Sequence, residues 1–138
     1  KTSKGEPYIG KVWPGKSVFV DYTLPDAAKW WGDKHAGLLD DGVAGIWNDM
    51  NEPADFESRD GGKWKDVIND DQGQNSKHDK MRNLFAFLEC KASYEGLARL
   101  RPDLRPYLIT RSGFAGIQRY ATMWTGDSLS NWSSLALN

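Results

Sequence analysis

The chain has 138 residues, a length that fits a single domain. Its formal net charge is −1 with acids and bases interspersed, which argues against nucleic acid as the main partner, because a phosphate-binding surface needs a basic excess. A hydrophobic content of 39% and a mean hydropathy of −0.66 predict a globular protein with a modest core, and no apolar run approaches the ~20 residues of a membrane span. We therefore expect neither a nucleic-acid partner nor a membrane partner.

The sequence leaves the cellular compartment unknown. No basic and apolar segments precede a cleavage site, so we expect no signal peptide, which favours the cytoplasm. The single Cys90 permits no internal disulfide. The segment Asn131-Trp132-Ser133 matches a glycosylation sequon, but so short a pattern often arises by chance. The seven tryptophans are unusual, and several of them beside carboxylates suggest a carbohydrate site.

The first part of the chain predicts a strand, a helix and a second strand. A Pro-Gly turn within Gly10–Gly15 precedes a short apolar strand at Ser17–Tyr22. A helix is expected from Thr23 to about Leu39, because a capping hydroxyl and the early Pro25 form a typical helix start. We expect its buried side to consist of Ala27, Trp31, Leu38 and Leu39. The apolar run Val43–Trp47 then predicts a buried strand.

The stretch Gly45–Pro53 places two acids and two amides at the end of that second strand. Because strand side chains alternate between faces, Trp47 and Asp49 point the same way, which brings an aromatic ring beside a carboxylate. This pair suits a sugar, whose apolar face stacks on the ring while the carboxylate addresses its hydroxyls or anomeric carbon. The residues alone leave two alternatives open, a cluster that caps the next helix and a hard-cation site formed by Asp49, Asn51 and Glu52.

A long loop and a long helix follow. Residues 53–78 form a polar loop, and loops of this length are usually functional, so we expect it to form a pocket wall. Apolar residues at helical spacing predict a helix at Met81–Leu100, which Pro102 stops. The two histidines, His35 in the first helix and His78 before the second, are interpreted as structural or solvated.

The remaining residues predict two more strands and a final helix. The strands are expected at Pro106–Arg111 and Tyr120–Thr125, joined by a loop with room for one helical turn, and the helix begins after Ser130 or Asn131. The alternation of strands and helices predicts a parallel sheet. Polar residues at the ends of successive strands are typical of (β/α)8 barrels, although a doubly wound open sheet places its site in a similar way.

Two further charged residues stand at the ends of these later strands. A retaining glycosidase needs two carboxylates about 5–5.5 Å apart, and Asp127, which follows Trp124 and a bend-permitting glycine, is the candidate partner of Asp49. The structural alternative is an Asp that only caps the next helix. Arg111 either keeps a nearby carboxylate ionised and binds sugar hydroxyls, or pairs with a loop acid.

Three segments resemble the signatures of glycoside hydrolase family 31, the α-glucosidases and their relatives. They are Trp47–Pro53 (WNDMNEP), Arg111–Gly116 (RSGFAG) and Trp124–Asp127 (WTGD). The resemblance implies that Asp49 is the catalytic nucleophile and Asp127 the acid/base. It also implies that Glu52 supports its loop. It assigns a further set of residues to the binding of the terminal sugar: Trp13, Trp47, Met50, Arg111 and Trp124.

The resemblance covers nearly the whole chain and favours the barrel over the open sheet. The four predicted strands resemble the third to sixth strands of an eight-stranded family 31 barrel. Residues 1–138 would then form a partial catalytic (β/α)8 (TIM) barrel domain, without the strands that supply an Asp, a Phe and a His to the sugar pocket. We therefore expect this chain by itself to be inactive and to self-associate through its open strand edges.

The implied function is that of a retaining exo-acting α-glycosidase, above all an α-glucosidase that hydrolyses terminal α-linked glucose from oligosaccharides by double displacement. The resemblance implies no metal and no organic cofactor. The alternatives are other family 31 activities, namely α-xylosidase or transglucosidase, and a non-catalytic carbohydrate-binding module.

Overall fold

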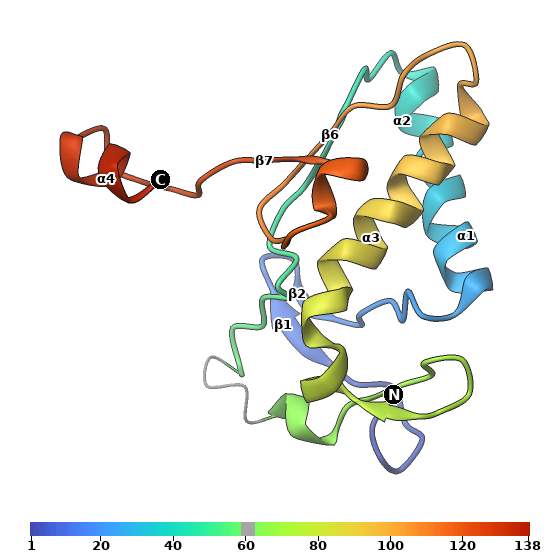
Figure 1. Cartoon of the computed structure of the whole chain (residues 1–138). Helices are drawn as coiled ribbons and strands as arrows, with labels where there is room; N and C mark the ends of the chain where they lie inside the picture. The colour runs from blue at the N-terminus through green and yellow to red at the C-terminus, as the bar shows by residue number, and fades with distance from the viewer. Residues whose placement is uncertain (59–62) are drawn as a thin grey trace.

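A three-stranded parallel sheet organises the computed structural model, which describes residues 1–58 and 63–138 (Figure 1). In spatial order its strands are β3 (Ile46–Asn48), β6 (Leu108–Thr110) and β7 (Thr122–Met123). Trp47 pairs with Ile109 and Ile109 pairs with Thr122, so these three residues form one row across the sheet. The parallel arrangement predicted from the alternation of elements is confirmed.

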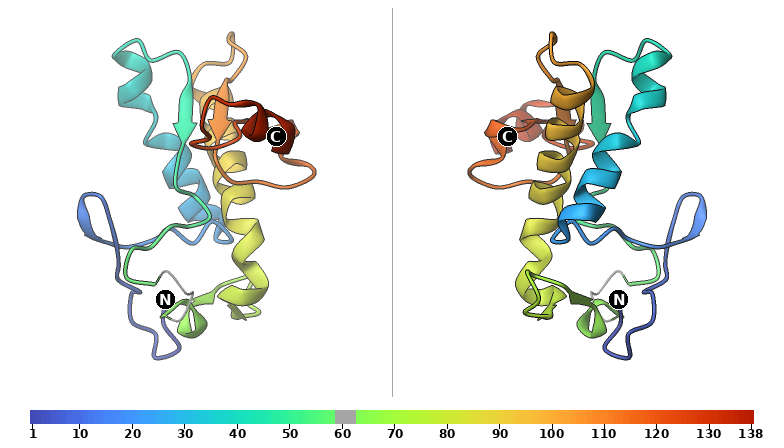
Figure 2. Two further views of the ribbon diagram at one scale, coloured as in Figure 1. Left: turned by 90° about the vertical axis from the view of Figure 1, so that its left-hand side faces the viewer. Right: turned by 90° about the vertical axis from the view of Figure 1, so that its right-hand side faces the viewer.

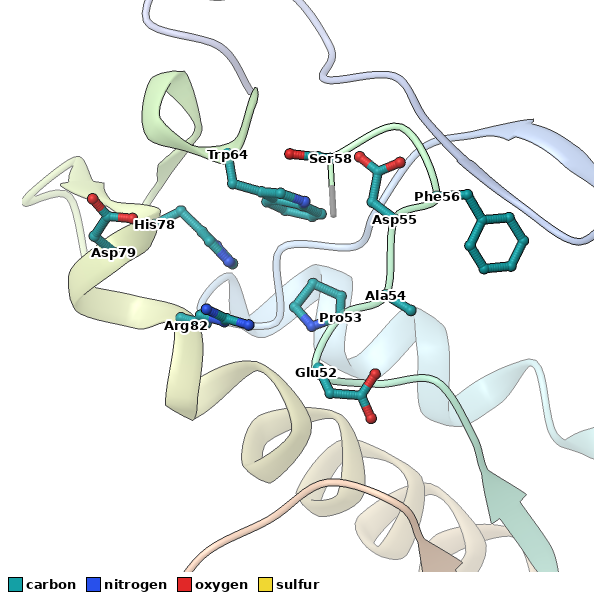
Figure 3. A pocket seen from close by; sticks show the side chains of 10 residues that line it. All are labelled: Glu52, Pro53, Ala54, Asp55, Phe56, Ser58, Trp64, His78, Asp79 and Arg82. Atoms are coloured by element: carbon teal, nitrogen blue, oxygen red, sulfur yellow. The ribbon is translucent and has the colours of Figure 1, made fainter. Parts of the chain in front are cut away.

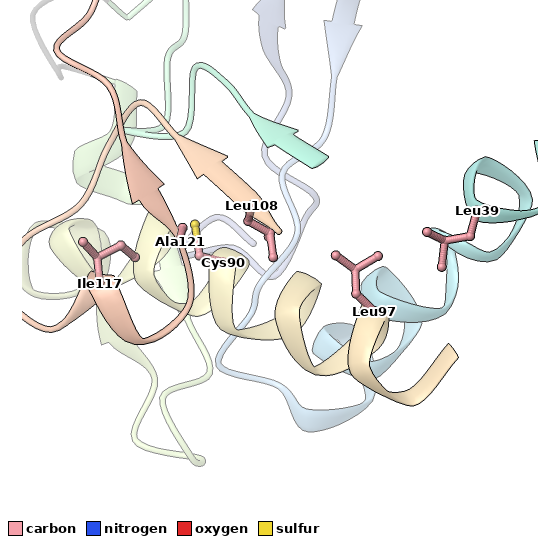
Figure 4. Packing of buried hydrophobic residues seen from close by; sticks show 6 residues of the cluster. All are labelled: Leu39, Cys90, Leu97, Leu108, Ile117 and Ala121. Carbon is pink, nitrogen blue, oxygen red and sulfur yellow. The ribbon is translucent and has the colours of Figure 1, made fainter. Parts of the chain in front are cut away.

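Helix α3 (His78–Leu100) covers one face of this sheet and, in the described part of the chain, contributes more residues to the core than any other element (Figure 1). Leu108 of β6 is only 2% exposed, and it belongs to one buried cluster with Cys90 and Leu97 of α3. The other members of the cluster, shown in Figure 4, are Leu39, Ile117 and Ala121. The predicted helix Met81–Leu100 is confirmed and begins three residues earlier than expected.

Two short helices stand where one long helix is predicted. They are α1 (Pro25–Asp33) and α2 (Ala36–Asp40), and they follow one another alongside α3 (Figure 2). The prediction of a continuous helix at Thr23–Leu39 is therefore wrong. The prediction that Leu38 is packed is also wrong, because its side chain is 47% exposed.

The buried His35 explains the break between α1 and α2. Its ring Nδ1 lies 3.1 Å from the carbonyl oxygens of both Trp31 and Gly32. In a continuous helix those carbonyls would accept from backbone N–H groups four residues further on. The imidazole competes for them and ends the first helix, which is a structural role for His35, as predicted.

The N-terminal part forms a hairpin instead of a strand of the central sheet. Strands β1 (Gly10–Val12) and β2 (Gly15–Ser17) pair antiparallel across the predicted Pro-Gly turn. The predicted strand Ser17–Tyr22 is wrong beyond its first residue, because the chain then runs irregularly and uses its apolar residues singly. Phe19 packs against aromatic rings and Tyr22 packs against α3. The partial barrel thus has three parallel strands in the described residues, not the four that were predicted.

The predicted loop at residues 53–78 contains regular structure. It holds the 3-10 helix η1 (Lys63–Asp66) and an antiparallel pair, β4 (Ile68–Asn69) with β5 (Ser76–Lys77). Residues 59–62, which belong to the predicted loop, lie outside the described residues. The buried Trp64 and Val67 attach the structured part to the start of α3, where the His78 N–H donates to the Val67 carbonyl (2.9 Å).

The C-terminal segment adds the last predicted elements. The single helical turn is η2 (Ile117–Arg119), and the final helix is α4 (Trp132–Leu137). Asn131 caps α4, as its Oδ1 accepts the Ser134 N–H at 2.8 Å. Helix α4 extends away from the rest of the chain and buries none of its residues (Figure 1). None of the helices in the described part of the chain has the length and apolarity to cross a membrane.

Helices α1 and α3 cross at two glycines. A methyl carbon added at Gly96 would lie 2.7 Å from the carbonyl carbon and oxygen of Gly32, which is closer than real contacts of this kind. The crossing therefore requires a residue without a side chain at this position. Gly37 of α2 is different, because no atom lies within 4 Å of an added methyl carbon there.

We predict that Gly96→Ala lowers the stability of the chain by about 1–3 kcal/mol, because the added methyl group forces two helix backbones apart. Gly37→Ala is the matched control, and we expect it to be neutral or to raise stability by up to ~1 kcal/mol. Thermal unfolding followed by circular dichroism measures both effects. Equal unfolding midpoints for the two variants would contradict the close approach of α1 and α3.

Candidate active site

The candidate nucleophile and Arg111 come together at the carboxyl ends of β3 and β6. Asn48 pairs with Thr110 in the sheet. Asp49 and Arg111, which directly follow these two residues, are therefore neighbours. The Arg111 N–H donates to the Asn48 carbonyl (3.2 Å), and Arg111 Nη1 lies 3.4 Å from Asp49 Oδ1. The Asp49 side chain is half exposed. The sheet register thus places a cation beside the predicted nucleophile.

Glu52 fixes the orientation of the Arg111 guanidinium. Arg111 Nε donates to Glu52 Oε1 (2.8 Å) and Nη2 donates to Oε2 (2.9 Å), which is the bidentate geometry of strong Arg–carboxylate pairs. These hydrogen bonds hold the pKa of the Glu52 carboxyl below its ordinary value and raise the pKa of Arg111. Arg111 therefore pairs with a loop acid through two nitrogens and directs the third towards Asp49, and its binding of sugar hydroxyls stays a prediction.

Asp127 lies within electrostatic reach of the same guanidinium. It follows β7, with Gly126 in the left-handed region (φ 82°) allowing the bend, and its side chain is exposed. The negative charges of Glu52, Asp49 and Asp127 all contribute to the raised pKa of Arg111, in that order. Arg111 thus interacts electrostatically with both predicted catalytic carboxylates.

Two of the predicted sugar-binding tryptophans meet on the sheet face opposite α3. The rings of Trp47 and Trp124 contact edge to face, with centroids 4.7 Å apart. Trp47 is 60% exposed, whereas Asn48, the next residue, is buried against α3. Because side chains alternate, Trp47 and Asp49 share the outward face, as predicted. The prediction that Val43–Trp47 is a buried strand is wrong for this chain, because that face is uncovered.

Trp13 and Met50 occupy different surroundings. Trp13 is at the tip of the β1–β2 hairpin, 81% exposed, and among the described residues its ring contact is with Phe56 (4.8 Å), so it is not part of the Trp47–Trp124 pair. Met50 adopts a left-handed backbone (φ 57°), which is uncommon for a non-glycine residue and often found at functional turns. Its N–H donates to Asp49 Oδ1 (2.8 Å), which orients the carboxylate.

A buried hydrogen-bond network beneath this turn is absent from the sequence-based prediction. Asn51 is 1% exposed, and its Nδ2 donates to Glu89 Oε2 (2.8 Å) and to Thr110 Oγ1 (2.9 Å), while its Oδ1 accepts the Ser112 N–H (3.1 Å). Tyr22 donates to the other oxygen of Glu89 (3.3 Å). One signal for Glu89 was available, because it is an acid on the apolar side of the α3 pattern.

The hard-cation alternative does not fit these contacts. Asn51 Oδ1 already accepts a backbone N–H, and both oxygens of Glu52 accept from Arg111. Within residues 1–58 and 63–138, no three His, Cys, Asp or Glu side chains are grouped to hold a metal ion. The oxygens of the Asp49–Glu52 stretch are thus used to fix the turn.

A cavity of about 510 Å³ lies beside Glu52, between the loop and the start of α3 (Figure 3). Trp64, His78 and Arg82 are among its lining residues, and neither Asp49 nor Asp127 lines it. His78 is buried with its ring 4.3 Å from that of Trp64, and burial lowers its pKa. Of the two interpretations of His78, structural or solvated, this packing supports the structural one.

These features define the class of the protein, a piece of a parallel β/α barrel with charged residues at the carboxyl ends of its strands. Residues 1–138 match the family described as glycosyl hydrolases family 31 TIM-barrel domain. The chain belongs to this family, so the resemblance noted in the sequence is confirmed.

Known proteins that resemble the chain are much longer than it is. Alpha-glucosidase 2 of Bacillus thermoamyloliquefaciens is 46% identical over 140 residues, which are 100% of this chain and 17% of that protein. A family 31 dextranase of Flavobacterium johnsoniae, solved in complex with glucose, gives a TM-score of 0.85 at 32% identity over 99% of this chain and 17% of its own. A family 31 α-glucosidase of Bacteroides thetaiotaomicron gives a TM-score of 0.74 at 40% identity over 98% of this chain and 21% of its own. The chain therefore spans about a fifth or less of these relatives.

The raised pKa of Glu89 makes the free energy of unfolding of the chain depend on pH. Burial raises the pKa of its carboxyl from 4.5 to about 7, against the opposing hydrogen bonds from Asn51 and Tyr22. Between these pH values the folded chain holds a proton that the unfolded chain has released, so this contribution to stability decreases as the pH rises from about 4.5 to about 7. The carboxyl of Glu52, with its lowered pKa, loses its contribution only in acid and does not vary in this window.

We predict that Glu89→Gln removes this dependence. Relative to the variant, the wild-type chain should lose on the order of 2–3 kcal/mol of stability between pH 5 and pH 8. Thermal unfolding of both proteins at the two pH values measures the difference, and the titration of His78 cancels because both proteins contain it. Parallel pH profiles would contradict the raised pKa of Glu89.

Proposed function

We propose that this chain is the central part of a catalytic (β/α)8 barrel, and that the longer polypeptide containing it is a retaining, exo-acting α-glucosidase. We call this longer polypeptide the parent. The observation that carries the proposal is the contact of Arg111 with Asp49 at the carboxyl edge of a parallel sheet, with Asp127 in electrostatic reach of the same guanidinium. In this proposal residues 1–138 are one partial domain and the loop at 53–78 is a wall of its pocket.

The reaction assigns one step to each carboxylate. Asp49 attacks the anomeric carbon of the terminal glucose while Asp127 donates a proton to the departing glycosidic oxygen, so a covalent glycosyl–Asp49 ester forms and the aglycone leaves. Asp127 then removes a proton from water, which attacks the anomeric carbon, releases Asp49 and gives glucose with retained configuration. No metal or organic cofactor takes part in this scheme.

The neighbouring residues suit these roles. The guanidinium of Arg111 lies 3.4 Å from Asp49 Oδ1, so a positive charge stands beside the carboxylate that attacks. Glu52 is unsuited to be the acid, because both its oxygens accept from Arg111 and its pKa is lowered. Asp127 has an exposed side chain, so its carboxyl can reach a bound substrate and water. Trp47 and Trp124 offer aromatic surfaces for the apolar face of glucose.

The substrate class rests on the relatives. Relatives that are 46%, 37% and 36% identical to the chain are called alpha-glucosidases, and a structural relative is a dextranase solved with glucose. This favours α-linked glucose over xylose and hydrolysis over transglucosylation. A non-catalytic carbohydrate-binding module would keep the tryptophans without needing Asp49 or Asp127, so substitutions of the two acids distinguish it from an enzyme.

In the parent, Asp49→Asn should lower kcat by on the order of 10⁴-fold or more on every substrate. Asp127→Asn should slow hydrolysis of a natural disaccharide by on the order of 10²–10⁴-fold, but should spare formation of the glycosyl ester from substrates with good leaving groups, because only a poor leaving group needs the proton. Steady-state kinetics and intact mass of the trapped ester measure these effects.

Asp26→Asn, in the exposed first turn of α1, is the control of the same chemistry and should leave turnover unchanged. Equal losses for the Asp49 and Asp127 variants on aryl and natural substrates, with no trapped ester, would refute the division of roles.

We also expect the isolated chain to self-associate and to lack glycosidase activity. Both β3 and β7 end the three-stranded sheet with unpaired edges in the described residues, and Trp47 (60% exposed) and Met123 (44% exposed) leave apolar surface uncovered. Light scattering should give a dimer or larger species, and an assay with an aryl α-glucoside should give no turnover. A strictly monomeric, active chain would be evidence against this expectation.

A further inference from the structure

Asn51 has every hydrogen-bonding group of its side chain satisfied, and this fixes its orientation. The Ser112 N–H can only donate, so the atom that faces it must be the amide oxygen. The two amide N–H groups then donate to Glu89 Oε2 and to Thr110 Oγ1. The Thr110 hydroxyl in turn donates a hydrogen bond to the Ser112 carbonyl oxygen (2.9 Å). A flipped amide would oppose its NH₂ group to the Ser112 N–H and its oxygen to the Glu89 carboxylate.

This oriented amide joins the two segments that carry the site. Asn51 lies two residues after Asp49, across the left-handed Met50, and Ser112 directly follows Arg111. The Asn51–Ser112 hydrogen bond therefore sets the distance between the Asp49 turn and the end of β6, on which the 3.4 Å contact of Asp49 with Arg111 depends.

Glu89 is the one partner of Asn51 that comes from outside these two segments. It projects from α3 at 8% exposure and is held from its other side by Tyr22, which precedes α1. Burial of the Glu89 carboxyl without hydrogen-bond donors would be strongly unfavourable. The Asn51 amide and the Tyr22 phenol supply these donors. Glu89 touches neither Asp49 nor Arg111 in the hydrogen bonds of the described chain.

We propose that Glu89 is a positioning residue, which orients the Asn51 amide and thereby holds Asp49 against Arg111 in the geometry required for glycosyl transfer. The inference rests on the proposed function for its reaction. Its structural part, the control of the Asp49 turn by a residue on α3, stands on the hydrogen bonds alone.

The proposal separates two substitutions of Glu89. Glu89→Gln keeps an acceptor oxygen for Asn51 and turns its NH₂ group to the Tyr22 oxygen, which can accept because the phenol rotates. Glu89→Leu has a similar volume and no acceptor, so one Asn51 proton is left unsatisfied and the amide is free to reorient. Ser93→Ala is the matched control, because Ser93 is fully buried one helical turn further along α3 and accepts from Trp31 and Asn48, not from Asn51.

The kinetic test uses the parent with p-nitrophenyl α-glucoside, below the unfolding midpoint of every variant. Glu89→Leu should lower kcat by on the order of 10- to 100-fold with KM changed less than about threefold, because misplacement of the reacting groups affects the chemical step. Glu89→Gln and Ser93→Ala should both keep kcat within about threefold, although Ser93→Ala lowers the unfolding midpoint because it removes the acceptor of Trp31 and Asn48. An equal loss in Glu89→Gln, or an equal loss in Ser93→Ala, would overturn the positioning role.

A second measurement does not depend on activity. Hydrogen exchange of the peptide containing Ser112 should accelerate at least about tenfold in Glu89→Leu and stay unchanged in Glu89→Gln and Ser93→Ala. If Glu89→Leu does not fold, Thr110→Val replaces it, because this isosteric change also removes one acceptor of Asn51 and should raise the same exchange rate. Unchanged exchange would overturn the inference, whereas changed exchange in a parent that fails the Asp49→Asn test would reject the proposed function only.

Discussion

The buried amide of Asn51 is the interaction on which the rest of the site depends. It is bonded to the end of β6 through Thr110 and Ser112 and to α3 through Glu89. In a low-dielectric interior such a network is stabilising only when every member has a partner, and here each of these groups has one. The turn from Asp49 to Glu52 therefore has a single well-defined path, although its outer side is exposed.

Electrostatics then arranges the exposed side of the same turn. Three acidic side chains, Glu52, Asp49 and Asp127, act on the one guanidinium of Arg111. Glu52 accepts both hydrogen bonds of a bidentate pair, and this fixes the position of the Arg111 guanidinium. Neither Asp49 nor Asp127 is held in a bidentate pair with this arginine in the described part of the chain. This division leaves Asp49 half exposed beside a fixed positive charge, which is a suitable state for a carboxylate that has to meet a substrate.

Packing around α3 supports both the buried Asn51 network and the exposed side of the Asp49–Glu52 turn. The helix packs on the sheet through Cys90 and Leu97 and on α1 at the Gly32–Gly96 crossing, and it carries Glu89 directly before Cys90. The N-terminal hairpin is attached separately. Asp55 accepts the Lys11 N–H (3.0 Å) and the Tyr8 hydroxyl, so the segment that follows the Asp49–Glu52 turn also holds the hairpin that carries Trp13.

The predictions that rested on residue type and alternation agree with the structure at the carboxyl ends of β3 and β6. Trp47 and Asp49 share a face, and Arg111 stands at the end of the neighbouring strand. Helix α3 ends at its expected residue Leu100, and α4 begins directly after its predicted cap Asn131. Strand parity and helical spacing are local properties, so a sequence states them directly. The family assignment likewise depends on short segments that can be read without coordinates.

Only the tertiary structure decided what depends on distant contacts. The strand predicted at Ser17–Tyr22 is absent because Phe19 and Tyr22 find aromatic and helical partners elsewhere in the chain, and the helix breaks at His35 because a buried ring takes its carbonyls. Glu89 is 38 residues from Asn51 in the sequence, and no local pattern links an acid in a helix to an amide in a turn. The sequence by itself determined which residues could react, and the fold determined which buried residues hold them in place, because hydrogen bonds between distant segments exist only after the chain has folded.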